Sequence, residues 1–148
     1  MKALLTITLL LAFGACVWGN TSEQIAEWKE RAENGDATVL FVLGYIYANG
    51  EGVPEDDKEA VKWFRKAAEQ GNVKAQWQIG SAYMSGSGVI EDKVQAYAWY
   101  NIAALNGSAN GNKGKEKVAE EMTKEQIAEA QKLSREMVEA NPKLMGED

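Results

Sequence analysis

The chain repeats itself with a period of 36 residues. When the sequence is shifted by 36 positions, residues 72–107 lie over residues 36–71 without a gap, and 12 of the 36 aligned positions are identical. A fixed period between about 20 and 50 residues is typical of stacked repeats, because one unit cannot bury its apolar face alone. The residues before Asp36 continue the pattern, since Ala32, Glu33 and Gly35 precede Ala68, Glu69 and Gly71 by the same period.

Each unit contains the start and stop signals of two helices. Asp56 and Asp92 have the character of N-caps, and Glu59 and Gln95 follow three residues later, as in a capping box. We therefore expect first helices over residues 36–48 and 72–85, and second helices over residues 56–70 and 92–106. Glycines are predicted to end helices at Gly35, Gly71 and Gly107, and to form the turns at Gly50, Gly52, Gly86 and Gly88.

Two glycines fall inside predicted helices, where glycine costs about 1 kcal/mol relative to alanine. Gly44 and Gly80 are expected to allow close packing, Gly44 against Ala60 and Ala67, and Gly80 against Ala96 and Ala103. Large aromatic residues also recur with the period. We interpret them as packing between repeats rather than as a ligand cage, because a structural period fixes their positions; they are Tyr47, Tyr83, Trp63 and Trp99.

The pattern changes after Gly107. Residues 108–122 resemble the start of another first helix, which Gly111 and Gly114 weaken. Residues 123–142 predict an amphipathic helix that begins with a Thr123–Gln126 capping box, and a solenoid needs such an end with one polar face. The apolar stripe of this helix is Ile127, Ala130, Leu133 and Met137 or Val138. From Met145 onward we expect fraying.

Composition removes several classes of function. The 148 residues carry a net charge of −6 and no histidine, and the single cysteine is Cys16. An acidic chain without a basic run is a poor nucleic-acid binder, and it lacks histidine bases and the usual zinc ligands. We predict no catalytic residues, no metal and no cofactor. A hydrolase using a Ser–Lys or carboxylate pair is the less favoured alternative, because the acids at residues 55–57 and 91–92 have the character of caps and turns.

The first 19 residues have the features of a secretory signal peptide. Lys2 precedes an apolar stretch over residues 3–15, which is too short for a membrane span of about 20 residues. Cleavage before Asn20 is favoured and gives a periplasmic or secreted protein. Cleavage before Cys16 is the alternative and gives a lipid-anchored one. The mature chain is predicted to be one domain, 20–148, with a half repeat 21–35, repeats 36–71 and 72–107, and a C-terminal cap 108–142.

The repeated residues resemble the Sel-1-like repeat, a relative of the tetratricopeptide repeat. The first copy carries Leu43, Gly44, Tyr47, Gly50, Gly52, Val53, Asp56, Ala60, Trp63, Ala67, Ala68 and Gly71. The resemblance implies an all-α fold, an α-solenoid of antiparallel helix pairs. It also implies a non-enzymatic scaffold that binds proteins. One cysteine-rich branch of the family has been linked to penicillin binding, and this chain lacks those cysteines, so that activity is not carried over.

A solenoid of this kind presents the faces of its first helices, so the predicted function is binding a protein partner through that surface. Helical spacing away from the core places six candidate residues there: Thr38, Val42, Tyr45, Lys74, Gln78 and Ser81. The acidic net charge suits a basic partner. For an exported member, the finer alternatives are immunity to a secreted bacterial toxin and a role as regulator or scaffold in an envelope complex.

Overall fold

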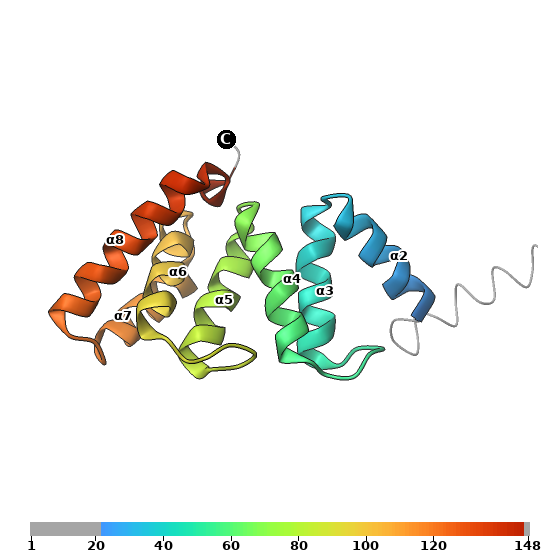
Figure 1. The fold of residues 1–148 in the computed structure, drawn as a ribbon, viewed down its shortest axis with the longest axis horizontal. Coiled ribbons are helices and arrows are strands. Elements are labelled where there is room, and N and C mark those ends of the chain that lie inside the picture. The colour runs from blue at the N-terminus through green and yellow to red at the C-terminus, as the bar shows by residue number, and fades with distance from the viewer. Residues whose placement is uncertain (1–21, 147–148) are drawn as a thin grey trace, which may run out of the picture.

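The computed structural model describes residues 22–146, which form seven α-helices, one short 3₁₀ helix and no strand (Figure 1). The leader at 1–19 and Cys16 lie outside the described residues. Each helix from α2 to α6 packs against the next one along the chain, and α8 packs against α6, so the predicted all-α solenoid is confirmed. The elements are α2 (Ser22–Glu33), α3 (Ala37–Asn49), α4 (Asp57–Glu69), α5 (Val73–Ser85), α6 (Lys93–Leu105), α7 (Ala109–Ala119), α8 (Lys124–Ala140) and η1 (Pro142–Met145).

Helices α3 and α4 form the first repeat, and α5 and α6 form the second. We call α3, α5 and α7 the A helices, and α4, α6 and α8 the B helices. The turns between A and B helices use glycine as predicted, with φ of 67° at Gly50 and 72° at Gly86, a left-handed conformation that other residues rarely adopt. The four helices of the two repeats, α3 to α6, begin and end within one residue of the expected bounds, because the caps are local signals.

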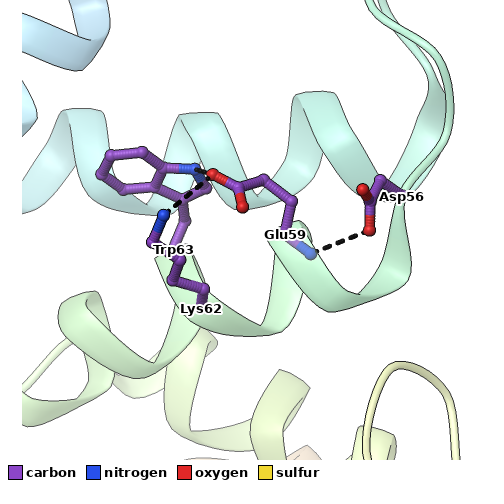
Figure 2. A network of polar contacts seen from close by, with 4 residues as sticks. All are labelled: Asp56, Glu59, Lys62 and Trp63. Atoms are coloured by element: carbon purple, nitrogen blue, oxygen red, sulfur yellow. Dashed lines mark hydrogen bonds and ion pairs between the residues drawn. The ribbon is translucent and has the colours of Figure 1, made fainter.

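The predicted N-caps are confirmed, but the capping boxes expected in the two repeats are not formed. The Asp56 carboxylate accepts a hydrogen bond from the backbone N–H of Glu59 (3.0 Å), and Asp92 does the same for Gln95 (3.0 Å). The reciprocal bonds are missing because the Asp56 N–H donates to the Tyr47 carbonyl (2.9 Å) and the Asp92 N–H to the Tyr83 carbonyl (3.0 Å). Figure 2 shows that the Glu59 carboxylate accepts from the Trp63 indole (3.0 Å) and pairs with Lys62.

Gly44 and Gly80 allow close packing, as expected, but against different partners. A Cβ at Gly80 would lie 2.6 Å from the Tyr100 ring, and a Cβ at Gly44 would overlap the Phe64 ring. The prediction of alanine partners for these glycines was therefore wrong. The alanines of the B helices are buried, but the bulky ring one turn away on the same helix is what occupies the space left by the missing Cβ.

The repeated aromatic residues form part of the core, as predicted. Trp63 and Trp99 are only 3% and 2% exposed, and Tyr47 is buried in the same cluster, against which Tyr83 packs. The guanidinium of Arg65 donates to the Tyr83 hydroxyl (2.7 Å) and lies over the Tyr83 and Trp99 rings. These rings therefore join one repeat to the next, and they do not surround a ligand site.

The glycines of α7 do not weaken that helix. Ser108 caps it by accepting from the Gly111 N–H (2.9 Å), as Asn72 caps α5 in the same register. A Cβ at Gly111 would lie 2.8 Å from the backbone nitrogen of Ala104, so this glycine lets α7 approach α6. The expectation that Gly111 and Gly114 disfavour the helix was wrong, because close tertiary packing compensates for their low intrinsic propensity.

Helix α8 covers the end of the array. Its Thr123–Gln126 capping box is complete, with both hydrogen bonds present. The predicted apolar stripe faces inward at Ala130, and Ser134 is also buried, where its hydroxyl accepts from Asn101 Nδ2 (3.0 Å) and donates to the Gln131 carbonyl (3.0 Å). The exposed face is rich in charge, as a terminal helix requires.

After Ala140 the chain turns back over the repeats, and η1 extends to Met145, the residue from which fraying was expected. Leu144 in η1 is buried, and its carbonyl accepts hydrogen bonds from Gln76 Nε2 (2.7 Å) and Asn106 Nδ2 (2.7 Å). Gln76 is fully buried and also donates to the Ala68 carbonyl (3.2 Å). Gly71 lies so close to this segment that a Cβ there would be 2.7 Å from the Cα of Gly146. The segment after α8 is therefore tied to both central repeats.

Candidate functional site

The A helices of the second repeat and of the C-terminal cap lie next to each other and enclose an open hollow. Helices α5 and α7 are in contact, and the hollow between their exposed faces has a volume of about 470 Å³. Tyr100 of α6 forms part of its floor. The lining residues are Trp77, Ser81, Met84, Ser85, Tyr100, Asn110, Lys113, Gly114 and Lys117.

The floor of this hollow depends on glycine. The Tyr100 ring lies between Gly80 on α5 and Gly114 on α7, where added Cβ atoms would come within 2.6 Å and 2.7 Å of it. Burial raises the pKa of the Tyr100 hydroxyl above its ordinary value of 10.0, and a hydrogen bond with Ser81 opposes that rise. The ring is therefore clamped in place and remains neutral at physiological pH.

A second hollow of about 460 Å³ adjoins the first. Trp77 and Asn110 line both, and Phe41 brings α3 to its edge. The Phe41 ring is itself held against Phe64, with 5.6 Å between ring centroids. We call the two hollows together the A-helix groove. The residues that line the second hollow are Phe41, Val73, Lys74, Trp77, Gln78, Asn106, Gly107, Ser108 and Asn110.

The charge of the A-helix groove is opposite to that of the chain. Helices α3 and α5 contain no acidic residue, and no acidic side chain lines either hollow. The charged lining residues are Lys74, Lys113 and Lys117, and none of these three forms an ion pair with another residue of the 22–146 range. The net charge of −6 therefore arises away from this surface.

The structure brings three of the six predicted site residues together. Lys74 and Gln78 line the second hollow, and Ser81 lines the first. Thr38 lies instead in a separate depression beside Gly71 and Lys143.

The other two predicted residues line none of the hollows described. Val42 packs against the core, and Tyr45 is 47% exposed on α3. Helical spacing selected the face of α5 that lines these hollows, but it did not show where along the A helices the surface is concave.

Sequence reasoning missed Trp77, Asn110, Lys113 and Lys117. The repeat itself contains the signal for the last three. When the 36-residue register is continued past Gly107, Lys74 is followed by Asn110, Trp77 by Lys113, and Ser81 by Lys117. The identities end at Gly107, so no candidate site residue was assigned beyond it, although the A-helix register continues into α7.

A further hollow of about 500 Å³ lies between α6 and α8, and it includes Leu105, which is 62% exposed. Arg135 and Glu139 both line it, so its charges are mixed. Unlike the A-helix groove, it is bounded by the B helices and η1.

No arrangement of titratable groups typical of catalysis occurs within residues 22–146. The pKa is shifted for Asp36, Lys93, Tyr100 and Glu121, and of these Tyr100 alone lines one of the hollows described. Asp36 and Glu121 have lowered pKa values, chiefly because hydrogen bonds from Arg31 and Lys93 favour the charged carboxylates. The described part of the chain has no group of three potential metal ligands. It also has no helix of the length and hydrophobicity that crossing a membrane requires.

Comparison with known proteins identifies the repeat. The family model of the Sel1 repeat matches residues 38–72 and 73–108. No curated protein matches the chain.

Two solved structures are similar along much of the chain. A protective antigen present in uropathogenic Escherichia coli strains, which displays an SLR fold, is 34% identical over 82% of this chain and 27% of its own, with a TM-score of 0.77. A Sel1 repeat protein from Oxalobacter formigenes is 34% identical over 64% of this chain and 28% of its own, with a TM-score of 0.62. The chain thus spans about a quarter of the length of these structures.

Proposed function

Since the chain is a Sel1-repeat protein, with a fold that typically mediates protein–protein interaction, we propose that it is an exported, non-enzymatic module that binds a protein partner in the A-helix groove. The observation that carries this proposal is the pair of adjoining hollows that share Trp77 and Asn110. They form a continuous concave surface with an aromatic residue at its centre, and such surfaces accept an anchoring side chain of a partner.

The size of the groove is suitable for this role. One aromatic side chain of a partner buries about 150–250 Å². That area corresponds to about 4–6 kcal/mol at about 25 cal/mol per Å², before the cost of association is subtracted. Because the repeats on both sides hold the floor in place, little of this energy is lost in ordering the groove.

Three considerations support a binding role over an enzymatic one. The charged lining residues of the groove are all lysines, so they offer no acid–base pair within hydrogen-bond reach. Tyr100 is the one lining residue whose pKa is shifted. Burial raises this pKa further above physiological pH, whereas an acid–base catalyst needs a pKa near that pH. The Sel1-repeat fold is also typically a scaffold.

Export is supported by the N-terminal sequence and by similarity. Residues 1–19 have the charge and hydrophobic pattern of a signal peptide. The similar E. coli protein is a protective antigen. We propose a periplasmic or secreted location after cleavage before Asn20, with a lipid anchor on Cys16 as the alternative. The intact mass of the purified protein distinguishes the two.

Co-purification from the native cell envelope tests the proposal. The full chain carries a C-terminal affinity tag, and bound proteins are quantified by mass spectrometry. Asn110→Trp fills the groove from an exposed position that lines both hollows. Asn112→Trp, which is exposed on the same helix and lines none of the hollows described, is the matched control.

We expect a stoichiometric partner with the unmodified chain and with Asn112→Trp, and its loss with Asn110→Trp. Retention of the partner by Asn110→Trp would show that another surface binds. Failure to find a partner with the unmodified chain would contradict the binding role itself. The identity of the partner separates the two finer functions, since a toxin indicates immunity and a sensor or assembly protein indicates regulation.

A further inference from the structure

The A-helix groove combines an apolar centre with positive charge at its edges. Trp77 lies where the two hollows meet, and Met84 and Tyr100 add apolar surface to the first. Lys113 and Lys117 follow one another by one helical turn on α7, so they lie on the same side of the groove. Lys74 lines the second hollow from α5. A ligand in the groove therefore meets lysines from two different helices.

These lysines are not neutralised by their surroundings. Lys115, on another face of α7, donates to Asn101 Oδ1 (3.3 Å) and so is engaged with α6. Glu121 lies near enough to Lys117 for that lysine to contribute to its lowered pKa, but its carboxylate is bound to Lys93 at 2.9 Å. Glu116, the one acidic residue within α7, lines neither hollow. The positive charge of the groove is thus available to a ligand.

We infer that the segment bound in the A-helix groove is an acidic peptide of the partner, with carboxylates beside Lys74, Lys113 and Lys117 and a large apolar side chain against Trp77. This inference rests on the proposed function and specifies the chemistry of the partner. It replaces the expectation of a basic partner. That expectation came from the net charge, whereas recognition depends on the local potential of the surface that makes contact.

Lysine favours such a ligand in two ways. Its ammonium group attracts carboxylates over several ångströms, so it accelerates association and discriminates against basic peptides. Its alkyl chain covers apolar surface at the same time, so the apolar anchor stays shielded from water. The first effect weakens the binding of any segment that carries Lys or Arg beside its apolar residues, and the groove therefore selects by charge.

Selection from a random peptide library tests the inference. Twelve-residue peptides displayed on phage are selected on the immobilised full chain, and enriched sequences are synthesised with a fluorescent label. Their dissociation constants are measured by fluorescence anisotropy at low and high salt. The charge-reversed variant is Lys113→Glu with Lys117→Glu. The matched control is Lys58→Glu with Lys124→Glu, which makes the same change in net charge at exposed lysines outside the groove.

We expect enriched peptides to contain Asp or Glu beside Trp, Phe or Leu. The charge-reversed variant should bind them at least about tenfold more weakly, while the matched control stays within about twofold. Affinity should also fall as salt is raised, because the charges are exposed. A neutral variant, Lys113→Gln with Lys117→Gln, should lie between these limits. Circular dichroism confirms that every variant is folded.

Two outcomes overturn the inference while leaving the proposed function intact. One is enrichment of neutral or basic peptides whose binding is abolished by Asn110→Trp. The other is enrichment of acidic peptides that the charge-reversed variant binds as well as the unmodified chain. If no enriched peptide depends on the groove, and the native partner is also retained by Asn110→Trp, both the inference and the proposed binding surface are wrong.

Discussion

Replacing Gly80 by alanine places two known effects in opposition. Alanine favours the helix by about 1 kcal/mol over glycine. The added Cβ, however, would lie 2.6 Å, 2.7 Å and 3.0 Å from three atoms of the Tyr100 ring. The ring cannot move away towards α7, because Gly114 already lies against it, with an added Cβ there at 2.7 Å. The cost of overpacking should therefore be near the upper end of its usual range.

This cost is about 3 kcal/mol, so the net destabilisation of Gly80→Ala is about 2 kcal/mol. With a urea m-value of about 2 kcal/mol per M for a domain of this size, the midpoint of unfolding should fall by about 1 M. The assay is equilibrium urea unfolding followed by far-ultraviolet circular dichroism, with the m-value unchanged between variants.

A double-mutant cycle with Tyr100→Leu isolates the contact. In the background without the ring, Gly80→Ala should become stabilising by up to about 1 kcal/mol, because only the gain in helix propensity remains. Gly80→Ala that stabilises the unmodified protein, or that costs the same with and without the ring, would refute the reasoning. The result also bears on function, since the clamped ring forms the floor of the A-helix groove.

Three further changes have expected outcomes. Gln76→Leu should destabilise the fold by about 1–3 kcal/mol, because it removes the buried amide that joins Ala68 and Leu144. An unchanged free energy of unfolding in urea would show that the hydrogen bonds of Gln76 to the segment after α8 add nothing to stability. The lowered pKa of Asp36 implies stability that is present above pH 3.8, its ordinary pKa, and is lost as pH falls below that value. Asp36→Asn should therefore reduce the loss of stability between neutral and acid pH. An unchanged loss would show that ionisation of Asp36 does not contribute to it. The raised pKa of Tyr100 implies stability that is present below pH 10.0 and is lost as pH rises above it. Tyr100→Phe should therefore resist alkaline unfolding better, and equal sensitivity would indicate that another group is responsible.

Features that depend on a few neighbouring residues were predictable from the sequence. The N-caps at Asp56 and Asp92, the turn at Gly50 and the box at Thr123 each use hydrogen bonds or dihedral angles within a few residues. Because the unit recurs every 36 residues, each local prediction applies again in the next repeat, and the solenoid was correctly predicted. The candidate site was predictable only in part, since helical spacing identifies a face but not its curvature.

The sequence by itself determined the repeat, the boundaries of the repeat helices, the family and the burial of the periodic aromatic residues. All of these depend on capping and turn residues within a few positions of one another and on the fixed period. Only the tertiary structure decided which ring meets Gly80, how Leu144 returns to Gln76, and that unpaired lysines gather in a groove of an acidic protein. The physical reason is that these features join residues from different units. Net charge and periodicity average over the chain, whereas packing and local potential depend on which side chains lie next to one another in space.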